Sequence, residues 1–268
     1  MEIFYFLNYE FIQRAYIAGI FVAALCAMLG LILVLRKLSL IGDGLSHVSF
    51  GAIALGLFFG IYPFYVAVPL VILASYLILR LTEKAKIYGD AAIGIVSSVG
   101  IAGGVVLSSL ARGFNVDLFS YLFGNILAIS RQEVYFSISL SLIVLAAIIF
   151  LYNDLFSATF DEDYAKVSGV KIKQINLILT FLTAITVILA IKVVGVMLVS
   201  ALLILPAVTA LQIVKGFKTA MIAAAALAIV SVIMGITISF FGDLPAGATI
   251  VIINFLFFIF FFFLKKVK

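Results

Sequence analysis

Long uncharged runs, separated by short polar linkers, follow one another along almost the whole chain. A helix that crosses a membrane needs about 20 predominantly apolar residues, because each residue adds about 1.5 Å and the hydrocarbon core is about 30 Å thick. Every run except the second has the length of about one crossing. The runs are Ala15–Leu35, Gly44–Leu79, Ala91–Ala111, Val134–Asn153, Gln174–Ile191, Val193–Val214, Thr219–Gly242 and Leu244–Leu264. The pattern therefore predicts a bundle of membrane-spanning helices.

The second run is too long for one crossing and contains a natural division. It breaks at Gly60–Pro63, because proline can begin a helix but cannot continue one. With two helices there, we predict an all-α polytopic membrane helix bundle of about nine transmembrane helices, with eight or ten as the alternatives. We expect residues 1–268 to form a single transmembrane domain, since no stretch has the composition of a soluble domain.

The basic residues are distributed unevenly between the linkers, and this distribution predicts an orientation. Cytoplasmic linkers of membrane proteins carry an excess of Lys and Arg. If the linker that contains Arg36 and Lys37 is cytoplasmic, thirteen of the 17 basic residues fall on that side. The other four are Arg14, Arg112, Arg131 and Lys192. We therefore predict that the N-terminus is outside the cell and the C-terminus inside.

The composition agrees with a membrane protein and excludes several other classes. The chain is 66% hydrophobic and 11% charged, with a mean hydropathy of +1.37, so its solvent must be a lipid bilayer. The net charge of +5 comes from scattered single and paired residues, so we expect no nucleic-acid partner. The one cysteine, Cys26, excludes a disulfide framework and a cysteine metal cluster.

Two segments depart from the pattern of spanning helices. Leu118–Ser130 is apolar but too short to cross the bilayer, so we expect an interfacial or re-entrant segment on the outer face. Ser157–Lys173 is the most polar part of the chain, and the charge distribution assigns it to the cytoplasmic side.

The motif Gly42–His47, GDGLSH, puts an aspartate and the only histidine of the chain at the start of an apolar helix. Asp43 and His47 are four residues apart, so their side chains share one helical face. An ionisable group within a membrane costs roughly 2.5–3.5 kcal/mol on insertion scales and is usually retained for function. A carboxylate and an imidazole can together bind zinc, manganese or ferrous iron. The alternative is that Asp43 caps the helix while His47 packs in a polar bundle core.

Asp43 and His47 alone fall short of the four ligands of a closed zinc site. A site through which an ion only passes should be under-coordinated, because an ion that binds too tightly does not leave. Two copies of the chain, facing each other across a two-fold axis, would supply two aspartates and two histidines. This reasoning favours a homodimer with a shared transit site.

Five further residues are candidates for the pathway or for helix packing. Ser46 lies in the same motif, between the two candidate ligands. Gly51 and Gly56 belong to a stretch of small residues that would let another helix approach closely. Pro206 could bend a helix beside the pathway, although bending without a function explains it equally well. Asp243 could meet a metal-delivery protein or could simply cap a helix.

Three segments occur in an order that resembles a known family. They are LRKLSLIGDGLSHVSFGAIALG (Leu35–Gly56), VVGVMLVSALLILPAVTA (Val193–Ala210) and GDLPAGATIVI (Gly242–Ile252). They resemble the membrane permease subunits of the zinc/manganese/iron-type ABC metal-ion importers, and the resemblance runs essentially from end to end.

This resemblance implies a homodimeric permease in the plasma or inner membrane of a bacterium or archaeon. It also implies two partners, namely ATP-binding cassette ATPase subunits in the cytoplasm and an extracytoplasmic metal-binding protein. In similar permeases the aspartate and histidine of the motif are associated with the metal pathway, and they correspond to Asp43 and His47 here. The cargo would be zinc or manganese, with iron as a further alternative, and no cofactor would be bound permanently.

The polar segment contains a short stretch with the pattern of a helix, with acids in its first turn and glycine at its end. It loosely resembles the Ala-x-x-x-Gly coupling element of ABC permeases, and the alternative is a solvated linker. The sequence has no G-x-x-x-x-G-K-[ST] motif, so we expect this chain to be a transport subunit and ATP hydrolysis to occur elsewhere. The candidate coupling residues are Asp161, Glu162, Asp163, Tyr164, Ala165 and Gly169.

Other functions fit the sequence less well. An ion-coupled secondary metal transporter would often show internal repeats and a relay of intramembrane carboxylates, whereas only Asp43 is a plausible intramembrane acid here. A permease for a metal chelate or siderophore would have little use for an aspartate–histidine pair. A membrane metalloprotease would need several histidines, and the chain has one.

Overall fold

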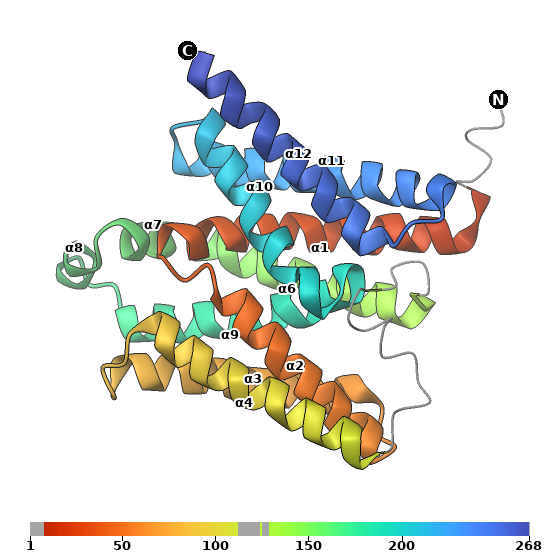
Figure 1. The fold of residues 1–268 in the computed structure, drawn as a ribbon. Coiled ribbons are helices and arrows are strands. Elements are labelled where there is room, and N and C mark those ends of the chain that lie inside the picture. The colour runs from red at the N-terminus through yellow and green to blue at the C-terminus, as the bar shows by residue number, and fades with distance from the viewer. Residues whose placement is uncertain (1–7, 112–123, 125–128, 268) are drawn as a thin grey trace.

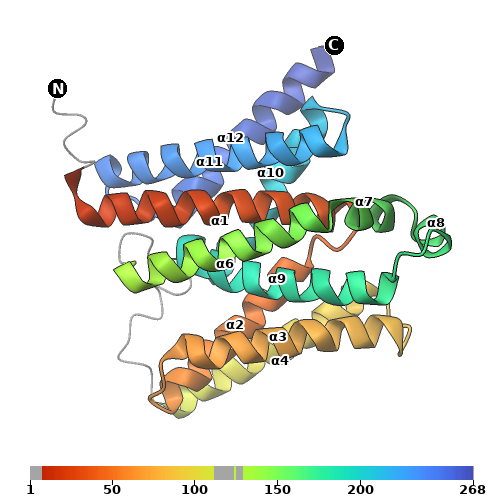
Figure 2. The same cartoon turned by 180° about the vertical axis from the view of Figure 1, so that it is seen from behind.

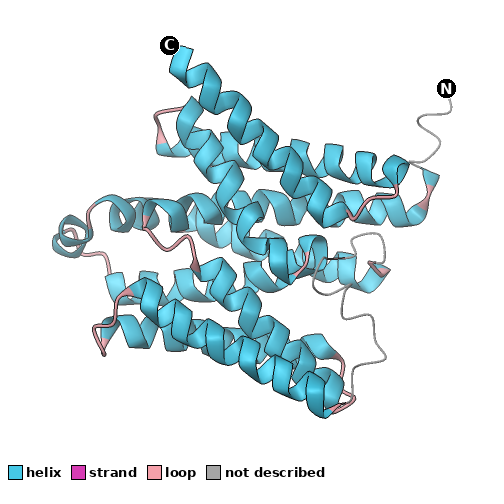
Figure 3. Cartoon of the chain, viewed as in Figure 1, coloured by secondary structure: helices cyan, strands magenta, loops and turns pink. Residues whose placement is uncertain are grey.

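The computed structural model describes residues 8–111, 124 and 129–267, and within these ranges every regular element is a helix (Figure 3). Eight of the helices are long and apolar enough to cross a membrane. They are α1 (Glu10–Leu35), α2 (Ile41–Phe58), α3 (Pro63–Glu83), α4 (Gly89–Leu110), α6 (Arg131–Phe150), α9 (Ile172–Val194), α11 (Phe217–Gly242) and α12 (Ala246–Val267). The prediction of an all-α polytopic bundle is therefore confirmed.

Four shorter elements complete the described chain. They are α7 (Tyr152–Phe160), α8 (Glu162–Val167), the 3₁₀ turn η3 (Val196–Leu198) and α10 (Val199–Ile213). The first two lie in the polar excursion, which is the connection between α6 and α9 and contains the polar segment Ser157–Lys173. The last two follow α9 and occupy the sixth apolar run of the sequence.

Each expected span corresponds to a helix, but one of them is short. The predicted break at residues 60–63 is present, since α2 ends at Phe58 and α3 begins at Pro63. In the sixth run, α9 continues to Val194 and Gly195 then interrupts the helix with a φ of +82°. Only 15 residues remain for α10, which at about 1.5 Å per residue falls short of a full crossing. The described residues thus hold eight long helices and one short apolar helix.

The helices pack in layers around α1, whose apolar window is 67% buried (Figures 1 and 2). On one side of α1 lie α11 and α12, and on the other side lie α6 and α9. The bundle of α2, α3 and α4 forms the far side of the molecule, next to α9. Helices α3 and α4 are mostly exposed, as expected of surfaces that face lipid or a partner chain.

Side-chain contacts show which linkers share an end of the bundle. At one end, Arg131 at the start of α6 donates to both carboxylate oxygens of Glu10 at 2.7 Å. At the other end, Arg36 after α1 donates to Glu162 of α8 at 2.7 Å. The linker after α1 and the polar excursion therefore lie together, as the charge distribution requires. The assignment of this end to the cytoplasm stays a prediction. Most of the segment expected to be re-entrant, residues 118–130, lies outside the described residues.

Helices α2 and α4 approach each other with backbone against backbone. A Cβ added to Gly51 would lie 2.4 Å from the carbonyl oxygen of Gly100. A Cβ added to Gly100 would in turn lie 2.7 Å from Cα of Val48. Gly56 lies in the last turn of α2, where a Cβ would lie 2.8 Å from Cα of Pro63 at the start of α3. Small residues thus allow the close packing of this bundle.

Candidate functional site

The first two turns of α2 hold the acid–imidazole pair. Oδ2 of Asp43 lies 3.4 Å from Nε2 of His47, so the two side chains do share one helical face. Asp43 is 45% and His47 24% exposed, which leaves both partly accessible. The position of Asp43 in the first turn is favourable, because the positive end of the helix dipole stabilises a carboxylate there.

The two glycines that flank Asp43 allow neighbouring helices to press against this turn. A Cβ on Gly42 would lie 2.4 Å from Cδ1 of Leu203 in α10. A Cβ on Gly44 would lie 2.5 Å from Cγ2 of Ile93 in α4. Both glycines are buried while the aspartate between them remains half-exposed. The GDG sequence therefore packs this turn of α2 against both α4 and α10, with the Asp43 side chain half-exposed.

Ser200, in the first turn of α10, reaches the same carboxylate. Its Oγ donates to Oδ1 of Asp43 at 3.2 Å. The positive ends of α2 and α10 therefore lie on either side of one carboxylate group. Ser200 is not among the candidate residues predicted from the sequence. The one available signal was its place in the second family-like segment, residues 193–210.

The other candidates from the sequence lie apart from the carboxylate and imidazole groups. Ser46 is buried and its Oγ donates to the backbone carbonyl of Asp43 at 2.8 Å, so it supports the helical turn. Pro206 is buried within α10, which continues past it to Ile213. Asp243 is exposed after α11, in the left-handed region with a φ of +50°, and its N–H donates to the carbonyl of Ser239. Asp243 thus forms the C-cap of α11.

Asp243 also lies at the opposite end of the bundle from α8. Its helix ends beside the start of α1, where the rings of Phe240 and Tyr9 are 6.2 Å apart. Thr237 of α11 similarly shares a hydrogen bond of 2.7 Å with Tyr16 of α1. Asp243 and the Asp43–His47 pair therefore belong to separate parts of the molecule.

One copy of the chain brings together few metal ligands. Among the residues that the structure describes, no group of three or more His, Cys, Asp and Glu side chains could hold a metal ion. The site in a single chain consists of one carboxylate, one imidazole and the hydroxyl of Ser200. A transition metal would find two good ligands here and would need the remaining ones from elsewhere.

The expected short helix of the polar excursion is present as α8. Oδ1 of Asp161 caps it by accepting the N–H groups of Asp163 and Tyr164, at 3.1 and 2.9 Å. Gly169 follows the helix with a φ of +89°. Ala165 is fully buried against the body of the protein, whereas Tyr164 is 66% exposed. The helix is thus anchored on one face and free on the other.

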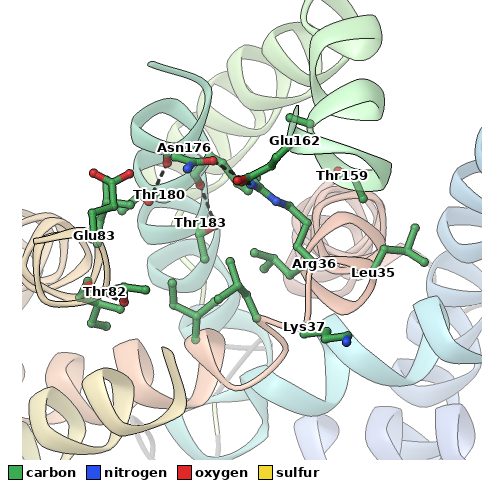
Figure 4. Close-up of a pocket in the computed structure, with 17 residues that line it drawn as sticks. Leu35, Arg36, Lys37, Thr82, Glu83, Thr159, Glu162, Asn176, Thr180 and Thr183 are labelled. Atoms are coloured by element: carbon green, nitrogen blue, oxygen red, sulfur yellow. Dashed lines mark hydrogen bonds and ion pairs between the residues drawn. The ribbon is translucent and has the colours of Figure 1, made fainter. Parts of the chain in front are cut away.

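A cavity of about 380 Å³ lies between α8, α9 and the ends of α1 and α3 (Figure 4). Arg36 reaches along it from the end of α1, and its Nη2 donates to Oε1 of Glu162 at 2.7 Å and to Oδ1 of Asn176 at 2.8 Å. Burial lowers the pKa of the Arg36 guanidinium, and the charge of Glu162 opposes that shift. From the sequence, Arg36 served only as a topology signal, because its partners lie 126 and 140 residues away.

These features define a class of protein. A bundle of long apolar helices, with a half-exposed acid–imidazole pair inside it and a short polar helix at one end, is typical of a multi-pass membrane transport protein. The chain belongs to the ABC 3 transport family, whose sequence profile matches residues 8–265.

Relatives with assigned names agree with this family. The manganese transport system membrane protein MntC of Halalkalibacterium halodurans is 33% identical over 261 residues, which cover 97% of this chain and 89% of that protein. The high-affinity zinc uptake system membrane protein ZnuB of Haemophilus influenzae is 34% identical over 245 residues, which cover 91% of this chain and 94% of that protein.

A solved structure is similar as well. A chain of PsaBC from Streptococcus pneumoniae, in complex with Fab, matches with a TM-score of 0.85 and 30% sequence identity. The match covers 96% of this chain and 92% of that one. The family resemblance of the sequence is therefore confirmed, and the chain is a multi-pass permease of the cell membrane in an ABC transport system.

Proposed function

We propose that this chain is the permease subunit of an ATP-driven importer for manganese or zinc ions. The observation that carries the proposal is the Asp43–His47 pair, 3.4 Å apart and partly exposed. Relatives named for manganese and for zinc transport support both metals as cargo. Imidazole is a good ligand for zinc and carboxylate for manganese, so the pair is compatible with either ion.

The transit site is completed by a second copy of the chain. One copy supplies one carboxylate and one imidazole, and a borderline divalent ion takes at least four ligands. A homodimer with its two-fold axis beside the pair would supply two of each. The 45% exposure of Asp43 leaves room for such a contact. Ligands divided between two chains can separate when the dimer opens, and the ion is then released.

Energy and cargo come from two further partners. ATP-binding cassette ATPase subunits bind at the end that carries α8, which faces the cytoplasm. There Tyr164 and Val167, 66% and 89% exposed, form the apolar tip that enters a cleft of the ATPase. An extracytoplasmic metal-binding protein delivers the ion at the opposite end, near Asp243. ATP turnover then exposes the transit site to each side of the membrane in turn.

The test is metal uptake by the complete transporter, reconstituted in proteoliposomes with its ATPase and binding protein. We expect Asp43→Asn and His47→Gln each to lower uptake of manganese and zinc about tenfold to a hundredfold, since each replaces a carboxylate or imidazole by a weakly binding amide in both halves of the site. Asp90→Asn is the matched control, because Asp90 is also an acid in the first turn of a membrane helix but is exposed and has no ion pair with His47. Normal uptake by both ligand variants would refute the proposal.

A further inference from the structure

Arg36 connects the two parts of the protein to which the proposed function assigns a role. Its guanidinium bonds to Glu162 in α8 and to Asn176 in the first turns of α9, at 2.7 and 2.8 Å. Only 9% of the Arg36 side chain is exposed, against 45% of Glu162. A buried cation of this kind is strongly tied to its anionic partner, because separation would leave the charge without compensation.

The chain between Arg36 and the Asp43–His47 pair is short and is held by backbone hydrogen bonds. The N–H of Leu38 donates to the carbonyl of Leu33 at 2.8 Å and closes the end of α1. The N–H of Ile41 donates to the carbonyl of Leu38 at 3.1 Å and begins α2. Asp43 follows two residues later. A displacement of Arg36 therefore reaches the first turn of α2 through a linker with little slack.

The space around Arg36 permits such a displacement. One side of the side chain faces the cavity of about 380 Å³, with Thr82 and Glu83 of α3 on the opposite wall (Figure 4). Helix α8 itself has six residues and is anchored through the buried Ala165. The bond between Glu162 and Arg36 joins this small helix to the end of α1. Asn176 of α9 accepts a second hydrogen bond from the same nitrogen atom of Arg36.

We propose that Arg36 is a positioning residue that transmits the movement of α8, through its bond with Glu162, to the metal-binding turn of α2. The inference rests on the proposed function of α8 as the element that docks the ATPase. When α8 moves, the Arg36–Glu162 pair moves with it, and the linker shifts the start of α2. Asp43 then changes its distance from Ser200 and from the second copy of the chain.

The experiment uses the complete transporter in proteoliposomes and measures two rates, metal uptake and ATP hydrolysis. The variants are Arg36→Gln, Glu162→Gln and the exchanged pair Arg36→Glu with Glu162→Arg. Lys84→Gln is the control, because Lys84 is an exposed cation at the same end of the bundle. Glu162→Gln serves also as the milder variant, since Glu162 is half-exposed and its loss should not prevent folding.

We expect both single variants to assemble with the ATPase and hydrolyse ATP, but to transport at least about fivefold fewer ions per ATP, the lower end of coupling between linked sites. The exchanged pair should recover part of that ratio, and Lys84→Gln should keep it. A residue that only stabilises the fold would lower both rates together and leave the ratio unchanged. An unchanged ratio in both single variants, or no recovery in the exchanged pair, would overturn the inference.

The same assay separates this inference from the proposed function. If Asp43→Asn abolishes uptake while Arg36→Gln and Glu162→Gln keep the wild-type ratio, only the role of Arg36 fails. If Asp43→Asn and His47→Gln transport normally, the transit site itself fails, whatever the Arg36 variants do.

Discussion

The hydroxyl of Ser200 donates to the carboxylate of Asp43 across a sequence separation of 157 residues, at 3.2 Å. This bond joins the first turn of α2, which contains the GDG sequence, to the first turn of α10, the helix that packs against Gly42. It holds one oxygen of Asp43 in place and leaves the other facing His47. The bond therefore determines how the carboxylate is presented to an incoming ion.

Ser200→Ala should weaken metal binding without abolishing transport. A hydrogen bond to a charged group contributes about 1.5–3 kcal/mol, and part of it is recovered by rotation of the freed carboxylate. We expect the metal concentration for half-maximal uptake to rise roughly threefold to tenfold, with little change in the maximal rate. Uptake measured against metal concentration tests this, and Ser200→Thr, which keeps the hydroxyl, should behave as wild type. An unchanged half-maximal concentration in Ser200→Ala would show that the bond is not used.

Gly51→Ala should destabilise the contact of α2 with α4. The new methyl group would lie 2.4 Å from the carbonyl oxygen of Gly100, so the two helices must separate. Overpacking of this kind typically costs about 1–3 kcal/mol. Thermal unfolding of the purified protein in detergent should show a lower midpoint. Gly103→Ala is the control, because Gly103 has no atom within 4 Å of its would-be Cβ. Equal midpoints for the two variants would contradict the close approach.

Gly195→Ala should disturb the start of α10. Gly195 has a φ of +82° and a ψ of 165°, a conformation that is essentially restricted to glycine. An alanine there costs about 1–3 kcal/mol or forces the chain to a different path, which would move Ser200 away from Asp43. We expect transport to fall more than thermal stability does. Gly94→Ala, at a helical position with open space around it, provides the comparison. Full transport by Gly195→Ala would argue against a fixed path between α9 and α10.

Asn254→Leu should have a small effect, although Asn254 is buried. Ser231 of α11 donates to Oδ1 of Asn254 at 2.9 Å, but the same hydroxyl also donates to the carbonyl of Leu227 within its own helix. Polar contacts between membrane helices contribute about 0.6 kcal/mol on average. The unfolding midpoint should therefore shift by no more than a few degrees, and uptake should be normal. A large loss of stability would mean that the contact of α11 with α12 depends on this bond.

Much of this fold follows from the sequence because the bilayer allows few solutions. Apolar run lengths gave the long helices, and Pro63 marked the boundary between α2 and α3. The predicted length of the helix in the sixth run was wrong by several residues, because α10 begins only at Val199. A run of uncharged residues carries no mark of a helix that ends and restarts inside it, and glycine is common in membrane helices. Only the φ of Gly195 distinguishes it from the other glycines of the chain that continue a helix.

Only the part of the candidate site that lies within one helix could be predicted from the sequence. The spacing of Asp43 and His47 placed both on one face of α2, since four residues make about one helical turn. Ser200 and the partners of Arg36 come from distant segments, and serine, arginine and asparagine are common at helix ends for unrelated reasons. Distant contacts of this kind leave no periodic pattern in the sequence, so tertiary structure was needed to find them.

The close approach of Gly51 and Gly100 limits how the protein can move. Two helices that touch through their backbones cannot slide or rotate independently without a steric clash, so α2 and α4 behave as one rigid body. Whatever opens the pathway on either side must carry both helices together. The bending point must then lie outside the pair, as in the linker at residues 84–88, rather than at any position within it.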